Sequence, residues 1–281
     1  MAEHYLGVDI GTSGTKALLL EAGGRVRATA TVSHPSLFPR PGWSEQRPDD
    51  WWRSACAAIK LALRKGRVSR DDVAGVGLSG QMHGSVFLDA HGRVLCNALL
   101  WNDQRTGAEC VELERRAGGR EELIRLVRNP ALTGYQAPKI LWLRAHQPQL
   151  FNRVRAVLLP KDYINFRLTG VLNSDVSDAS GTLLFDVANR RWSTELMRRL
   201  ELEPALFPAV DESCAIIGAV TAIAARATGL RAGTPVVAGA GDQAAAAVGT
   251  GVVRPGIVSA TMGTSGVVFA HSATPVPKSY K

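Results

Sequence analysis

The string Gly-Thr-Ser-Gly occurs twice in this chain, at 11–14 and at 263–266, and each copy lies between two short apolar runs. An apolar run that ends in a Gly-rich turn and is followed by a second run predicts two antiparallel strands. Two such units in one chain indicate an internal duplication rather than a low-complexity repeat. The flanking runs are 5–10 and 17–20 for the first copy, and 257–261 and 267–270 for the second.

The remaining pattern is that of an α/β chain. Residues 25–32 alternate polar and apolar, so with the first two runs they predict an antiparallel meander. Pro48-Asp49-Asp50 suits a helix start. The residues expected on the buried face of that helix are Trp52, Ala55, Cys56, Ile59 and Leu63. Further helices are predicted over 107–117, 138–146, 161–168, 193–200, 219–228 and 243–248, strands over 72–78 and 235–238, and a hairpin over 86–88 and 94–101.

Composition excludes several classes of protein. The net charge is +8, from 33 basic and 25 acidic residues, but the basic residues are dispersed, which argues against nucleic-acid binding. A mild positive potential favours anionic substrates such as nucleotides. No apolar run reaches the ~18 residues that span a membrane, and no signal peptide is predicted. The four scattered cysteines form no CxxC pair, and we expect reduced thiols in a cytoplasmic protein.

The first Gly-rich loop has the chemistry of a phosphate site. Glycines let backbone N–H groups approach a phosphate, and Thr and Ser add hydroxyl donors. Asp9, at the strand end, could bind a Mg²⁺ that bridges phosphate oxygens. The alternative is a plain hairpin turn; the sequence is neither a Walker A loop nor a Rossmann fingerprint. The candidate phosphate residues are Gly11, Thr12, Ser13, Gly14 and Lys16 in the first copy, and Gly263, Thr264 and Ser265 in the second.

Three other segments carry candidate site residues. Asp242 follows Gly239-Ala240-Gly241, and its carboxylate could take a proton from an attacking hydroxyl, although Asp is also a favoured helix N-cap. Residues 80–84 (GQMHG) read as a binding loop or as a turn with an incidental histidine. Residues 101–105 (WNDQR) suit a hydroxyl-rich ligand, or Asp103 caps a helix.

In chain order these segments resemble the FGGY carbohydrate kinases. The QMHG segment favours relatives that act on xylulose over those that act on glycerol. The matching pieces, which cover nearly the whole chain, are GVDIGTSGTKALLL (7–20), PGWSEQRPDDWW (41–52), GLSGQMHGSVFLD (77–89), ALLWNDQR (98–105), APKILW (137–142), VLLPKDYINFRLTG (157–170), SDVSDASGT (174–182), VVAGAGDQAAAAVG (236–249) and SATMGTSG (259–266).

The resemblance implies two actin-like (ribonuclease H-like) α/β lobes, each a mixed sheet with helices on both faces, and ATP-dependent phosphorylation of D-xylulose at O5 with Mg²⁺. Asp242 matches the family's catalytic base and Asp9 its Mg²⁺-associated acid. Met82 and His83 match the pair that contacts the sugar, and residues 101–103, including Trp101 and Asp103, match a segment lining the same cleft. Thr12, Ser13 and Thr264 match loops that hold the nucleotide's phosphates.

Two departures leave alternatives open. Gln243 stands where the family commonly has Asn and would contact the sugar, and Gln136 replaces a smaller residue. We expect a sugar-binding lobe at 1–230 and the incomplete start of an ATP-binding lobe at 231–281, so the isolated chain is expected to be inactive. Another sugar or polyol kinase (ribulose, fuculose, glycerol) and a non-catalytic sugar-binding fragment are the alternatives. The expected partners are a ketose and ATP, without nucleic acid or membrane; a homodimer is compatible with the sequence.

Overall fold

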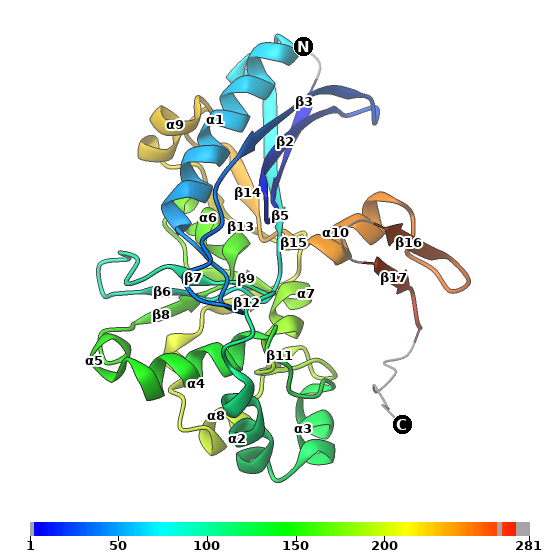
Figure 1. Cartoon of the computed structure of the whole chain (residues 1–281). Helices are drawn as coiled ribbons and strands as arrows, with labels where there is room; N and C mark the ends of the chain where they lie inside the picture. The colour runs from blue at the N-terminus through cyan, green and yellow to red at the C-terminus, as the bar shows by residue number, and fades with distance from the viewer. Residues whose placement is uncertain (1–2, 263–265, 274–281) are drawn as a thin grey trace.

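The computed structural model describes residues 3–262 and 266–273 (Figure 1). Its main sheet has the strand order β13-β14-β5-β1-β2-β3, and β15 also pairs with β5. The meander β1-β2-β3 is antiparallel as predicted, whereas β5 runs parallel to β1, β14 and β15, so the sheet is mixed. The strands are β1 (His4–Ile10), β2 (Gly14–Glu21), β3 (Val26–Ser33), β5 (Val73–Gly80), β13 (Ile216–Ala219), β14 (Pro235–Val237) and β15 (Ala240–Gly241).

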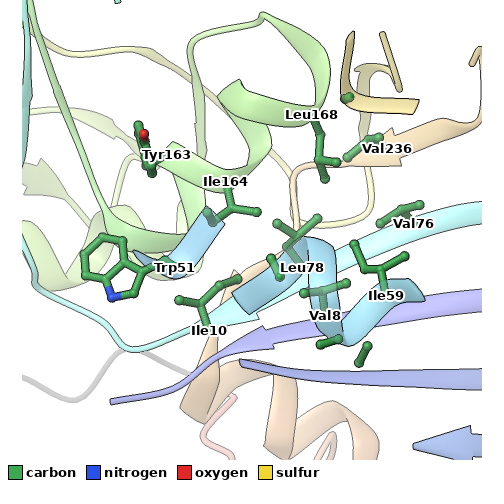
Figure 2. Packing of buried hydrophobic residues seen from close by; sticks show 14 of the residues in the cluster. Val8, Ile10, Trp51, Ile59, Val76, Leu78, Tyr163, Ile164, Leu168 and Val236 are labelled. Atoms are coloured by element: carbon green, nitrogen blue, oxygen red, sulfur yellow. The ribbon is translucent and has the colours of Figure 1, made fainter. Parts of the chain in front are cut away.

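Helices cover one face of this sheet. Alternate residues of β1, among them Val8 and Ile10, are buried because side chains in a strand point to opposite faces in turn. Figure 2 shows them packed with side chains of α1 (Pro48–Gly66) and α6 (Pro160–Thr169), and α9 (Ala222–Thr228) packs against both helices. The predicted mixed sheet with flanking helices is confirmed; α1, α6 and α9 pack on one face, and Tyr5 on the other face is 43% exposed.

Helix α1 begins where predicted, but its buried face is rotated. Trp51 is fully buried and its Nε1 donates to Gln46 Oε1 at 2.8 Å, whereas Trp52 and Cys56 are only half-buried. Trp52 packs against the core from its edge and is only partly buried. Gln46 supplies the acceptor for the indole N–H of Trp51, a pairing that the sequence did not reveal.

The predicted hairpin over 86–101 is formed only in part. β6 (Val86–Leu88) pairs with β8 (Ala156–Leu158), and β7 (Ala98–Leu99) pairs with β4 (Glu45–Gln46). Two isolated bridges, Leu88 with Val94 and Ser85 with Leu99, make up the local pairing. Distant segments therefore supply the strand partners, and no short-range signal could identify them.

A second hydrophobic cluster lies below the main sheet in Figure 1, among α2, α3, α4 and α8. The predicted helices over 107–117, 138–146, 161–168 and 193–200 are confirmed within about two residues, while α3 was not predicted. The remaining elements are α2 (Gly107–Ala117), α3 (Arg120–Val127), α4 (Gln136–His146), α5 (Pro148–Phe151), α7 (Val176–Ala179), α8 (Thr194–Arg199), β9 (Asn173–Asp175), β10 (Phe185–Asp186), β11 (Arg191–Trp192) and β12 (Ala209–Asp211), with 3₁₀ turns at Arg70–Asp72, Ser180–Thr182 and Pro204–Leu206.

The last elements extend away from the main sheet (Figure 1). They are α10 (Asp242–Gly249), β16 (Val258–Met262) and β17 (Gly266–Ala270), and β16 pairs with β17 as predicted. β14 and β15 follow the expected lobe boundary at 230/231 yet belong to the main sheet, and that boundary stays a prediction. No helix in the described part of the chain is long and apolar enough to cross a membrane.

Candidate functional site

Three parallel strands of the main sheet end side by side. Ile10 at the end of β1 pairs with Gly80 of β5, and Gly80 pairs with Gly241 of β15. The carboxyl ends of parallel strands share one edge of the sheet, and ligands bind in crevices outside such ends. This register brings together the loops that begin at 11, 81 and 242, which are far apart in the sequence.

A cavity of about 240 Å³ lies at this edge. Six of its lining residues were predicted from the sequence, and Gln81 and Val267 were not singled out. Gln81 could have been found inside the GQMHG loop, whereas Val267 arrives from a distant hairpin and left no sequence signal. The lining residues are Thr12, Gln81, Met82, His83, Trp101, Asp242, Gln243 and Val267.

The loop after β1 is a tight turn. The Gly11 N–H donates to the Gly14 carbonyl at 3.0 Å, and a Cβ on Gly14 would lie 2.8 Å from the carbonyl oxygen of Val32. The buried His34, which sequence reasoning did not select, has its Nε2 3.0 Å from the Gly11 carbonyl and its Nδ1 3.1 Å from Ser54 Oγ. Because a carbonyl only accepts, Nε2 carries a proton. Burial lowers the pKa of His34, which favours a neutral ring.

Asp9 faces the side of the sheet opposite the helices. It pairs with Lys16 on β2 and with Ser79 on β5, and Ser79 Oγ donates to Asp9 Oδ1 at 2.8 Å. Lys16 is exposed, so its side chain is available to an anion at this edge. The second Gly-rich loop cannot be compared with the first, because Gly263, Thr264 and Ser265 lie outside the described residues.

Asp242 is the first residue of α10 and lines the cavity. The N-cap of α10 is Gly241, so the alternative that Asp242 is only a helix cap is wrong. Burial raises the pKa of Asp242, and the charge of the nearby Asp9 raises it further, whereas the backbone N–H of Gln243 opposes the shift. A carboxylate with a raised pKa is a better proton acceptor than one in water.

His83 is held in a defined orientation. Its backbone has φ of 68°, and its Nδ1 lies 2.7 Å from the carbonyl oxygen of Gly181. Since that carbonyl only accepts, Nδ1 donates, and in the neutral ring Nε2 is an acceptor. The Tyr135 ring meets His83 edge-on at 4.8 Å between centroids. These contacts disfavour the reading of His83 as incidental to a turn.

Lys139 contacts the loop that carries His83 and was not identified in the sequence. It is fully buried, and its Nζ donates to the carbonyl oxygens of Thr133, Gly134 and Tyr135 and, at 3.4 Å, of His83. Burial lowers the pKa of Lys139 to about 7, while neighbouring Asp103 opposes the shift. An ammonium bound to several carbonyls holds the chain behind His83 in one conformation.

A chain of hydrogen bonds connects the first Gly-rich loop to the cavity. Trp101 Nε1 donates to Thr12 Oγ1 at 3.1 Å, Thr12 Oγ1 donates to Gln81 Oε1 at 3.2 Å, and Gln81 Nε2 donates to Gln46 Oε1 at 2.9 Å. The Thr12 hydroxyl is thus occupied by two side chains that line the cavity. The loop expected to hold phosphate is therefore joined to the residues expected to hold the sugar.

Asp103 does not line the cavity. It is fully buried, and its carboxylate accepts from the Ser44 N–H at 2.7 Å and from the Arg105 guanidinium. It does not cap α2 either, since Thr106 is the N-cap. The geometry supports a role for Asp103 in holding the loop that carries Trp101 rather than in contacting a ligand.

Gly181 is expected to be essential for the orientation of His83. A Cβ at Gly181 would lie 2.5 Å from His83 Nδ1, so Gly181→Ala must displace the ring from the cavity wall. We expect the Kd for a sugar ligand to rise about tenfold, which corresponds to about 1.4 kcal/mol. Calorimetry measures it, with Gly107→Ala as the control because a Cβ there meets nothing within 4 Å. Equal affinities in both variants would contradict the assignment.

Comparison with known proteins matches residues 4–249 to the N-terminal domain of the FGGY family of carbohydrate kinases. The chain is 44% identical over 268 residues to the xylulose kinase of Escherichia coli K12 and 36% identical over 269 residues to that of Bacillus subtilis. These matches cover 95% and 96% of this chain and 54% of each relative, so the chain spans about half the length of the curated relatives it matches.

Solved structures show the same likeness. A xylulose kinase from Rhodospirillum rubrum superimposes with a TM-score of 0.93 at 31% identity, covering 98% of this chain and 56% of that one. A "xyloylose kinase" from Brucella ovis gives 0.88 at 40% identity, covering 95% and 55%. The predicted α/β fold, that of the sugar kinases with actin-like lobes, is confirmed by these neighbours.

Proposed function

Because the chain belongs to the FGGY family of carbohydrate kinases, we propose that it takes part in the ATP-dependent phosphorylation of D-xylulose at O5, giving D-xylulose 5-phosphate. The observation that carries this proposal is the cavity in which Met82, His83 and Asp242 meet. The names of the curated relatives support xylulose as the sugar. We place the reaction in the cytoplasm.

The proposed roles follow from the contacts. Asp242, with its raised pKa, accepts the proton of the attacking hydroxyl as the hydroxyl oxygen bonds to the γ-phosphorus and the bond from that phosphorus to the departing ADP breaks. His83 Nε2 accepts a hydrogen bond from another sugar hydroxyl, because Nδ1 is fixed as the donor. Trp101, 40% exposed, offers a ring face to the sugar, and Gln243 offers an amide.

We place Mg²⁺ and the phosphates beside the cavity, at the end of β1, where Asp9 lies without lining the cavity itself. Family members use ATP, typically with Mg²⁺, and carboxylate oxygens are the ligands Mg²⁺ prefers. Asp9 fits this requirement, since a cation there would relieve its repulsion with Asp242. No group of three or more acidic, His or Cys side chains could hold a metal among residues 3–262 and 266–273. The remaining ligands would then be water and phosphate oxygens, and the metal would offset negative charge on the phosphates.

Sugar binding tests the proposal. We expect the chain to bind D-xylulose by calorimetry more tightly than D-ribulose or glycerol, and His83→Ala to raise the Kd about fivefold to tenfold, the effect of about 1–1.5 kcal/mol for a lost hydrogen bond. His91→Ala, a surface substitution in a turn, is the control. Preference for another ketose would support a different sugar kinase. Absence of binding to every sugar would contradict the proposal.

A second candidate function, a sugar-binding module, follows from the share of its relatives that the chain covers. The matched region is about half of each relative. Sugar binding without ADP release in the presence of Mg²⁺·ATP would support a sugar-binding module. We expect this result for the isolated 281-residue chain, since phosphoryl transfer depends on fixing the nucleotide as well as the sugar.

A further inference from the structure

The backbone that leads into Asp242 is fixed from one side by α6. The carbonyl oxygen of Ala238 accepts from Lys161 Nζ at 3.0 Å and from Asn165 Nδ2 at 2.8 Å. Both donors are fully buried. A peptide that receives two such bonds cannot rotate without taking one acceptor from the Lys161 ammonium and the Ala238 acceptor from the Asn165 amide, which is costly in a buried site.

The next residues are fixed from other elements. The Gly239 N–H donates to the Ser213 carbonyl at 2.9 Å, and the Gly241 N–H donates to Ser177 Oγ at 3.1 Å. Gly239 has φ of 77°, and a Cβ on it would lie 2.2 Å from the Leu78 carbonyl oxygen, so this segment lies directly against β5. Four separate segments of the chain, α6, β5 and those of Ser177 and Ser213, thus hold residues 238–241.

Asp175 connects these supports. Its Oδ2 accepts from Ser177 Oγ at 2.6 Å and from Ser213 Oγ at 2.8 Å, and its Oδ1 lies 3.2 Å from Lys161 Nζ. Because a carboxylate only accepts, the Ser177 hydroxyl donates to Asp175 and its lone pair receives the Gly241 N–H. The direction of the hydrogen-bond chain from Asp175 to the residue before Asp242 is therefore fixed.

The ionisable side chains next to this series of hydrogen bonds are buried. Lys161, Asp162, Asp175 and Asp178 are all fully buried, so one ammonium faces three carboxyl groups. Neither oxygen of Asp178 has a hydrogen-bond partner among the described residues. Burial raises the pKa of Asp178 well above its usual value, while the nearby Lys161 opposes the shift.

We propose that Lys161, Asp175 and Ser177 are positioning residues that fix the Asp242 carboxylate at the sugar hydroxyl by holding residues 238–241. The kinetic consequence rests on the proposed function, but the geometric part does not. The hydrogen bonds that join the cluster to this segment go to the Ala238 carbonyl and the Gly241 N–H. Loss of the cluster should therefore move Asp242 while leaving the sugar contacts of Met82 and His83 in place.

Hydrogen exchange and an Asp242 titration test the proposal in the 281-residue chain without any assay of turnover. Ser177→Ala removes the acceptor of the Gly241 N–H, and exchange of that amide should rise about fivefold or more. The same variant should lower the pKa of Asp242 toward its ordinary value, measured by carboxyl NMR, as the freed residue becomes more solvated. Ser177→Thr, which keeps the hydroxyl, should restore both values.

Ser180→Ala is the matched control, because Ser180 Oγ donates to the Ser177 carbonyl and makes no contact with residues 238–241. Unchanged exchange at Gly241 in Ser177→Ala would overturn the proposal, as would equal changes in Ser180→Ala. Altered exchange together with an unchanged Asp242 pKa would mean that the cluster only stabilises the fold, and this result would also overturn the proposal. Failure to bind sugar would contradict the proposed function and leave these two readouts intact.

Discussion

Asp242→Asn is expected to lower phosphoryl transfer to D-xylulose by about 10²–10⁴-fold, the usual contribution of a general base. An amide keeps the size of the side chain but cannot accept the proton of the attacking hydroxyl. Sugar affinity should change little, because His83 and Met82 are untouched. The measurement is coupled ADP release with D-xylulose and Mg²⁺·ATP, made on the longest polypeptide that the gene encodes, with calorimetry of the sugar alongside.

The same variant should be slightly more stable than the wild type at neutral pH. A carboxyl group whose pKa is raised by folding binds protons more tightly in the folded state, so its ionisation opposes folding above that pKa. The gain should amount to on the order of 2 °C in Tm and should vanish as the pH falls below about 4. Asp71→Asn, at an exposed position, is the charge-matched control. Wild-type turnover in Asp242→Asn would refute the role of Asp242.

Lys161→Met is expected to lower the free energy of unfolding by about 3–5 kcal/mol, as when one member of a buried ion pair is removed. Lys161 Nζ lies 2.6 Å from Asp162 Oδ1 and 3.2 Å from Asp175 Oδ1, and all three side chains are fully buried. Methionine fills the space of the lysine stem but supplies no charge. The carboxylates would then remain buried without a cation.

The pH dependence identifies the cause of this loss. Burial already raises the pKa of Asp162, and without Lys161 it should rise further, so the variant binds more protons when folded and loses stability as the pH rises. We therefore expect the deficit, measured by urea unfolding, to be larger at pH 8 than at pH 5. Lys60→Met, on the exposed side of α1, controls for the loss of a surface charge. A deficit below about 1 kcal/mol at both pH values would show that the pair contributes little.

The period of the sequence determined much of the fold. Apolar runs at 5–10 and 17–20 and alternation in 25–32 gave the correct meander. The Gly-rich turn at 11–14 was also located correctly, and there the close contact between Gly14 and the Val32 carbonyl admits no side chain. Six of the eight residues that line the cavity were also identified, since each follows a strand end or a glycine.

Partners far apart in the sequence could not be predicted. The strand 86–88 pairs with 156–158 rather than in a regular hairpin with the adjacent segment, because strand pairing depends on how whole layers of the fold pack together. Trp51 rather than Trp52 entered the core because Gln46 supplies the acceptor for its indole N–H. Asp103, expected to contact the sugar, is instead enclosed by Ser44 and Arg105.

The sequence by itself identified Asp9, His83 and Asp242 as candidate site residues, because each stands near the end of a predicted strand and beside a glycine-rich turn. Only the tertiary structure decided how they meet. The register of β1, β5 and β15 brings their ends to one edge, and buried groups such as Lys139 and Lys161 hold the loops beyond them. The residue types that a loop needs are set by its own backbone conformation. Its position in the fold depends on hydrogen bonds and charges supplied by residues more than fifty positions away.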